Sequence, residues 1–140
     1  MRKLIIDRGN SRIKVGLCLN DNNDSLDTYI FDSLVELQTF LREIGAIDNC
    51  IYSDVKKESK SLEEILIEFG ISFIRCNYLL KLPFQLDYKT PQTLGDDRIA
   101  AVAAANHIFP EENTLVIDSG TCITYDFLDE ERRYRGGAIS

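Results

Sequence analysis

Two similar motifs, more than one hundred residues apart, constrain the fold of this chain most. Residues 4–11 read Leu-Ile-Ile-Asp-Arg-Gly-Asn-Ser, and residues 115–121 read Leu-Val-Ile-Asp-Ser-Gly-Thr. Each is an apolar run followed by Asp, one variable residue, Gly and a small polar residue, which is typical of a buried strand that ends in a tight turn. Glycine has no Cβ, so such a turn lets backbone N–H groups approach a ligand closely.

The carboxylates at the two expected strand ends, Asp7 and Asp118, are candidate ligands for a magnesium–phosphate complex. Mg²⁺ prefers few protein carboxylates and retains water and phosphate oxygens. One Asp-x-Gly sequence alone would indicate only an ordinary hairpin turn. Two copies after Ile/Val/Leu strands favour duplicated halves that face one nucleotide.

The composition limits the classes of partner. The chain has 140 residues, 44% of them hydrophobic, which allows one domain, or one domain and part of another, with a substantial core. A formal net charge of −7 argues against extensive binding to nucleic acid or anionic membranes, which requires a basic surface. A small anionic ligand remains compatible, because it needs only a few local donors.

The cysteines and the N-terminus indicate a cytoplasmic protein. Cys18, Cys50, Cys76 and Cys122 are scattered, so we expect reduced, partly buried thiols, with zinc binding or disulfides as the less favoured alternative. No apolar run approaches the roughly 20 residues of a membrane span. The N-terminus carries no apolar signal-peptide segment.

The hydrophobic periodicity predicts an α/β chain. Expected strands cover 3–7, 12–19, 27–31, 50–53, 71–74, 114–118, 121–128 and 132–139, expected helices cover 34–44, 61–69 and 96–107, and 77–94 is expected to be a long loop. Ser33 and Glu36 predict a capping box for the first helix. The order predicts a first domain over 1–110, whose first three strands are antiparallel, and the first strands of a second domain over 111–140. Because the sequence ends inside strand-like residues, we expect the chain to be a fragment.

Four motifs along the chain resemble those of the type III pantothenate kinases. They are Asp7-x-Gly9-Asn10-Ser11-x-x-Lys14, Leu94-Gly95-Asp96-Asp97-Arg98, Asp118-x-Gly120-Thr121-x-x-Thr124-x-Asp126 and Gly136-Gly137-x-Ile139. Tyr88, nine residues before Asp97, matches a substrate-contacting tyrosine of that family. Arg8, Ser11, Ser119 and Cys122 depart from the residues that are usual in the family.

The resemblance implies an actin-like ATPase fold of the ribonuclease-H-like class, with a mixed sheet and flanking helices and the first strands of a second, similar domain. It implies ATP-dependent phosphorylation of pantothenate to 4'-phosphopantothenate, the first step of coenzyme A biosynthesis. It also implies Mg²⁺, a monovalent cation (K⁺ or NH₄⁺) and a homodimer. We expect the 140-residue chain alone to be inactive, because half of the nucleotide cleft would be missing.

The resemblance also assigns roles to individual residues. Asp97 is the expected general base, in the sense of a group that accepts the proton of the substrate hydroxyl. The expected ATP- and phosphate-binding residues are Asp7, Gly9, Asn10, Ser11, Lys14, Gly120 and Thr121. The expected substrate-binding residues are Tyr88, Gly95, Asp96, Asp97 and Arg98. The expected metal ligands are Asp7 and Asp118 for Mg²⁺, directly or through water, and Asp126 for the monovalent cation.

Several of these residues have a plain structural alternative. Asp96 or Asp97 could simply cap the helix, and Arg98 could either bind the substrate or pair with Asp97. The helix N-terminus and Arg98 lower the pKa of Asp97 whereas Asp96 raises it, and the sequence leaves that balance open. Lys14 either reaches a phosphate or faces solvent, and Asp126 could be a solvent-facing strand residue.

Two other functions are alternatives to a kinase. Proteins that resemble this chain have been associated with transcriptional accessory activity, but the sequence shows no helix-turn-helix pattern or basic face. A non-catalytic nucleotide-binding fragment is the second alternative. The presence of Asp7, Asp97 and Asp118 argues against this second alternative for the parent protein.

Overall fold

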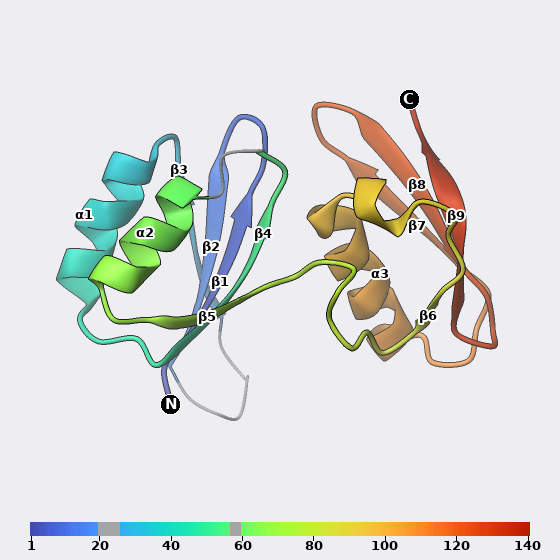
Figure 1. Ribbon diagram of the computed structural model, residues 1–140, viewed down its shortest axis with the longest axis horizontal. Coiled ribbons are helices and arrows are strands. Elements are labelled where there is room, and N and C mark those ends of the chain that lie inside the picture. Colours follow the sequence, from blue (N-terminus) through green and yellow to red (C-terminus); the bar gives the residue numbers. More distant parts are fainter. Residues whose placement is uncertain (20–25, 57–59) are drawn as a thin grey trace. The chain divides into compact units, whose positions relative to one another are not determined.

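The structure is a computed structural model that describes residues 1–19, 26–56 and 60–140. It consists of two compact units, Met1–Arg75 and Cys76–Ser140, which are described separately (Figure 1). Among the helices of these described segments, none has both the length and the apolar character that a membrane crossing requires.

The first unit contains a five-stranded mixed sheet. In chain order its elements are β1 (Lys3–Arg8), β2 (Ile13–Cys18), β3 (Leu26–Phe31), α1 (Leu34–Ile44), β4 (Asn49–Asp54), α2 (Lys60–Glu68) and β5 (Ser72–Arg75). The strand order is β3-β2-β1-β4-β5, with β1, β2 and β3 antiparallel and with β4 and β5 parallel to β1. The expected mixed sheet with three antiparallel leading strands is confirmed.

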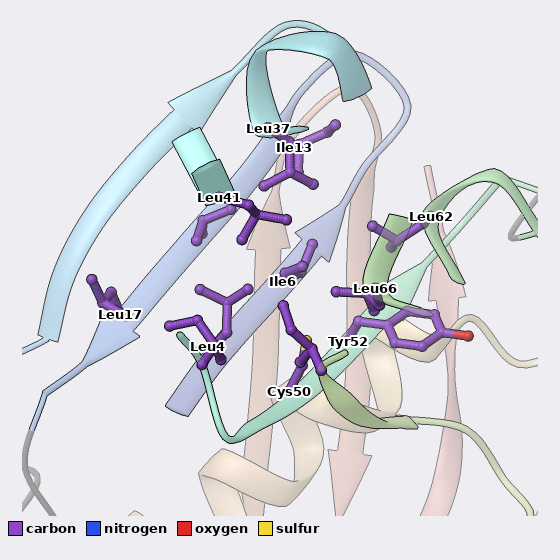
Figure 2. Close-up of a cluster of buried hydrophobic side chains, with 13 residues drawn as sticks. Leu4, Ile6, Ile13, Leu17, Leu37, Leu41, Cys50, Tyr52, Leu62 and Leu66 are labelled. Carbon is purple, nitrogen blue, oxygen red and sulfur yellow. The ribbon is translucent and has the colours of Figure 1, made fainter. Parts of the chain in front are cut away.

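A hydrophobic core fills the space between this sheet and its two helices (Figure 2). Alternate residues of β1 and β2 enter the core, as the period of two in a strand requires. Leu37 and Leu41 of α1 and Leu62 and Leu66 of α2 pack against them. The predicted cap of α1 is present, because the Ser33 hydroxyl accepts a hydrogen bond from the Glu36 amide at 3.2 Å.

The second unit packs one helix on a smaller sheet. Its elements are β6 (Gln85–Leu86), a 3₁₀ turn (Pro91–Thr93), α3 (Asp96–Ile108), β7 (Thr114–Ser119), β8 (Ile123–Leu128) and β9 (Arg133–Ile139). The strand order is β6-β9-β8-β7, and β7, β8 and β9 form the expected antiparallel meander. The loop expected over 77–94 contains β6, whose two residues pair with β9. A two-residue strand is too short to give a periodic signal in the sequence.

The compact units divide the chain between Arg75 and Cys76, and the expected domains over 1–110 and 111–140 stay a prediction. The first unit ends at Arg75 and the second begins at Cys76, so α3 belongs to the second unit, where it packs on β7 and β8. The sequence places α3 after β5 and shows no preference for either sheet, so strand and helix order alone did not reveal this partner.

Candidate functional site

The first Asp-x-Gly motif lies at the end of β1. Leu4 and Ile6 point into the core, so Asp7 lies on the opposite face of the sheet, where its side chain is 41% exposed. Asp7 pairs in register with Ser53 of β4 and with Lys14 of β2. The Ser53 hydroxyl donates a hydrogen bond to the Asp7 carboxylate at 2.6 Å, and the Lys14 ammonium lies 4.0 Å from the other carboxylate oxygen. The carboxylate is therefore oriented and still accessible.

The turn after β1 leaves its small polar residues exposed. The Gly9 amide donates to the Arg12 carbonyl at 3.0 Å, and Asn10 and Ser11 lie at the exposed tip. Exposed backbone amides in such a turn can surround an anion. Lys14 is 68% exposed and its ammonium lies beside Asp7, so its contact with a phosphate stays a prediction.

Arg8, the unusual residue of this motif, points into the protein. Its guanidinium is 3.2 Å from the Asp54 carboxylate and 3.4 Å from the Ser61 hydroxyl, and the two charged side chains are 9% and 0% exposed. Arg8 therefore ties the end of β1 to β4 and α2, on the face opposite to Asp7.

The second Asp-x-Gly motif forms the corresponding turn between β7 and β8. The Gly120 amide donates to the Cys122 carbonyl at 3.0 Å. Asp118, which pairs in register with Thr124, is exposed, as are Gly120 and Thr121. The geometry resembles the turn at Gly9 and leaves a carboxylate and backbone amides accessible.

The Gly95-Asp96-Asp97-Arg98 motif forms the first turn of α3. Gly95 is the N-cap, and a Cβ there would lie 2.4 Å from a carboxylate oxygen of Asp97. The same oxygen accepts a hydrogen bond from the Arg98 amide at 2.9 Å. Asp96 is buried, whereas Asp97 is half-buried. Glycine therefore leaves room for the side chain of Asp97, the more accessible of the two carboxylates.

Arg98 enters a buried polar network with Asp126 and Tyr134. Its guanidinium nitrogens lie 2.6–3.1 Å from the Asp126 carboxylate, and the Tyr134 hydroxyl donates to that carboxylate at 2.6 Å. Burial lowers the pKa of Arg98, but the hydrogen bond and charge of Asp126 outweigh it and raise the pKa. Burial and the hydrogen bond to Asp126 both raise the pKa of Tyr134. Arg98 therefore stays charged and the Tyr134 phenol stays neutral in the network.

The structure brings together residues from three of the predicted motifs around Tyr134. The ring centroids of Tyr88 and Tyr134 are 5.8 Å apart. A Cβ on Gly136 would lie 3.7 Å from the Tyr88 ring. Tyr134 belongs to none of the motifs, and only its position two residues before Gly136-Gly137 could have suggested it. Ser53, which orients Asp7, was also missed, although it ends the strand expected over 50–53.

The two metal roles fit the structure differently. Asp126 does not fit a monovalent-cation ligand, because it is 1% exposed and its carboxylate is already bound to a guanidinium and a phenol. Asp7 fits a water-mediated Mg²⁺ ligand, because it is held by Ser53 and stays accessible. The described segments contain no cluster of three or more His, Cys, Asp or Glu residues that could hold a metal by themselves. A Mg²⁺ ion at Asp7 would thus depend on phosphate oxygens and water.

Solved structures with little sequence identity share this fold. The ethanolamine utilization protein EutJ from Carboxydothermus hydrogenoformans matches with a TM-score of 0.58 and 10% identity, over 100% of this chain and 52% of that one. The Lmo2764 protein from Listeria monocytogenes matches with a TM-score of 0.54 and 14% identity, over 98% and 52%. Together with the mixed sheet and flanking helices, these likenesses confirm the actin-like ATPase fold class.

The chain belongs to the type III pantothenate kinase family, whose model matches residues 3–140. The type III pantothenate kinase of Christiangramia forsetii is 41% identical over 140 residues, which are 98% of this chain and 56% of that protein. The Flavobacterium johnsoniae enzyme of the same name is 39% identical over 145 residues, with the same coverage. The chain thus spans about half the length of these curated relatives, and the expected family is confirmed.

Proposed function

We propose that this chain supplies the phosphate-binding turns and the general base of an ATP-dependent pantothenate kinase. The observation that carries the proposal is Asp97: it is half-buried, lies at the N-terminus of α3 and has a place cleared for it by Gly95. Family membership supports pantothenate as the substrate and ATP as the phosphate donor.

The two Asp-x-Gly turns would hold the phosphates of ATP. Backbone amides around Gly9 and Gly120 are the candidate hydrogen-bond donors to the phosphates, with Asn10, Ser11, Lys14 and Thr121 beside them. The family resemblance implies a Mg²⁺ ion with Asp7 and Asp118 as ligands through water, and this ion would neutralise phosphate charge, which is the main requirement of phosphoryl transfer.

Asp97 would accept the proton of the pantothenate hydroxyl as the γ-phosphoryl group is transferred. Tyr88 would contribute an aromatic wall, since its ring is half-buried and already packed against Tyr134. Arg98 is a positioning residue in this proposal, because its guanidinium is bound to Asp126. The proposal also includes a monovalent cation, a homodimer and a cytoplasmic location, all of which rest on the family.

The test joins residues 1–140 to the part of the Christiangramia forsetii kinase that follows the matched region. The chimera should consume ATP only with pantothenate and should form 4'-phosphopantothenate, detected by mass spectrometry. Asp97→Asn should lower kcat by about 10²–10⁴-fold, the usual contribution of a general base, and should change ATP affinity little.

Two comparisons make the test specific. Asp7→Asn should also weaken Mg²⁺-dependent nucleotide binding, whereas Glu112→Gln, an exposed change between α3 and β7, should alter neither quantity. An Asp97→Asn chimera with near-normal kcat would return Asp97 to the role of a helix cap. Nucleotide binding without any turnover by the unsubstituted chimera would favour the non-catalytic alternative.

A further inference from the structure

The buried network of Arg98, Asp126 and Tyr134 links three elements of the second unit. Arg98 belongs to the first turn of α3, Asp126 to β8 and Tyr134 to β9. Their side chains are 1–9% exposed. The adjacent residue in the helix is Asp97, and its carboxylate is bound to the Arg98 amide. Any shift of Arg98 therefore moves the group that holds Asp97.

The guanidinium is held on two sides. Two of its nitrogens contact the Asp126 carboxylate at 2.6–3.1 Å, and one of them also lies 3.2 Å from the Tyr134 hydroxyl. The same hydroxyl donates to Asp126 at 2.6 Å, so the three groups form a closed triangle. A closed triangle fixes both the position and the rotation of the guanidinium plane, which a single ion pair would not do.

The backbone of β9 also closes on this network. A Cβ on Gly137 would lie 2.6 Å from an Arg98 guanidinium nitrogen and 2.8 Å from the Asp126 carboxylate, as well as 1.8 Å from the Tyr125 carbonyl oxygen. Only glycine permits so close an approach. The Gly136-Gly137 motif thus has a structural reason: it lets β9 pass directly beside the ion pair.

We propose that Tyr134 and Asp126 are positioning residues for Asp97, which they hold in place through Arg98 and the first turn of α3. The proposal rests on the role of Asp97 in the proposed function. It assigns a role to Tyr134, which no motif includes, and it gives Asp126 a task other than cation binding. Because the triangle contacts one end of α3, a positioning role predicts a local effect at that end, whereas a role in overall stability predicts an equal effect along the helix.

The first experiment measures amide hydrogen exchange in the 140-residue chain. The Ile99 amide, which donates to the Gly95 carbonyl, reports the first turn of α3, and the Phe109 amide, which donates to Ala105, reports its other end. Tyr134→Phe removes only the hydroxyl and should speed exchange at Ile99 by about 2- to 10-fold, with little change at Phe109. Asp126→Asn, which keeps the size of the side chain, should have the larger effect. Tyr125→Phe, a half-exposed tyrosine of β8, is the matched control and should change neither amide.

Equal acceleration at Ile99 and Phe109, or none at either, would overturn the proposal. A second readout uses the chimera: Tyr134→Phe should lower kcat by about 10-fold or less and leave the KM for ATP unchanged, because a misplaced base slows only the transfer step. An active chimera with unchanged kcat for Tyr134→Phe would also overturn it. A chimera that is inactive without any substitution counts against the proposed function, and the exchange experiment then still decides whether the triangle positions the first turn.

Discussion

The meander β1–β2–β3 and the meander β7–β8–β9 share a hairpin but bury opposite faces. In each, an Asp ends the first strand: Asp7 pairs with Lys14, and Asp118 pairs with Thr124. The following pairs, Arg8 with Ile13 and Ser119 with Ile123, keep the same register. The residues of the two hairpins can therefore be compared position by position.

The face that α1 and α2 cover in the first unit is exposed in the second. Leu4 and Ile6 are each 1% exposed, whereas Leu115 and Ile117, which take their places, are each 57% exposed. The other face of each sheet shows the opposite pattern. Asp126 has the position in β8 that Gly16 has in β2. Gly16 lies on the face of the first sheet that points away from α1 and α2, whereas Asp126 lies on the face that packs against α3.

This difference shows that the strand pattern provides two usable faces and that the helices decide which one becomes the core. Apolar residues at matched positions are buried in one unit and exposed in the other. Stability should therefore depend on these positions unequally, and four pairs of substitutions test how far the contrast extends.

The largest effect should come from the buried ion pair at the end of β1. Asp54→Ala leaves the Arg8 guanidinium buried without this carboxylate, which typically costs about 3–5 kcal/mol. Ser119→Ala changes the exposed position that matches Arg8 and should cost less than about 0.5 kcal/mol. Urea unfolding, monitored by amide exchange in β1 and β7, measures the change in the free energy of unfolding for both substitutions. Equal costs at the two sites would mean that the ion pair contributes nothing to the contrast.

The matched leucines should give the next largest contrast. Leu4→Ala opens a cavity in the core and should cost about 2–5 kcal/mol, whereas Leu115→Ala should cost less than about 0.5 kcal/mol. The same urea and exchange measurements apply. If Leu115→Ala is as costly as Leu4→Ala, the exposed face of β7 is covered in solution, and the comparison between the units fails.

Much of the fold could be predicted, because it follows from local patterns. The apolar runs before Asp7 and Asp118 and the capping box at Ser33 each have their signal within a few residues. The partner of α3 could not be predicted in this way. That helix carries buried charged residues at its start and alanines along its length, so its sequence shows no clear apolar stripe.

The candidate site was only partly predictable for a similar reason. The motifs gave the residues, but the contact between Arg98 and Asp126 joins positions 28 apart in the sequence. The alternatives expected for Arg98 were a substrate contact and a pair with its neighbour Asp97, and the expected task of Asp126 was cation binding. Both interpretations treated strand and helix residues by local rules, whereas packing of α3 on β8 creates the ion pair.

The stability of the first unit should fall at alkaline pH. Burial raises the pKa of Cys50 from 9.0 to about 12, so the contribution of its neutral thiol is complete below pH 9. Between pH 9 and about 12 the unfolded chain loses this proton and the folded chain keeps it, so stability decreases as pH rises. Cys50→Ala should reduce the slope of unfolding free energy against pH in this range, measured for the first unit (residues 1–75) by urea unfolding. Cys122→Ala, an exposed change in the other unit, is the control and should leave that slope intact.

The smallest effect concerns the two helix caps. Ser33→Ala removes the hydroxyl that binds the Glu36 amide and should cost about 1 kcal/mol. Gly95→Ser would introduce a good capping residue at α3, yet its Cβ would lie 2.4 Å from the Asp97 carboxylate. Because that carboxylate ends a flexible side chain, it can move, and we expect the stability of α3 to change little while the contact of Asp97 with the Arg98 amide is lost. In the same preparations, urea unfolding measures the stability, and the chemical shift of the Asp97 carboxylate reports its contact with the Arg98 amide. An unmoved Asp97 resonance in Gly95→Ser would show that glycine is not required there to make room for the proposed base.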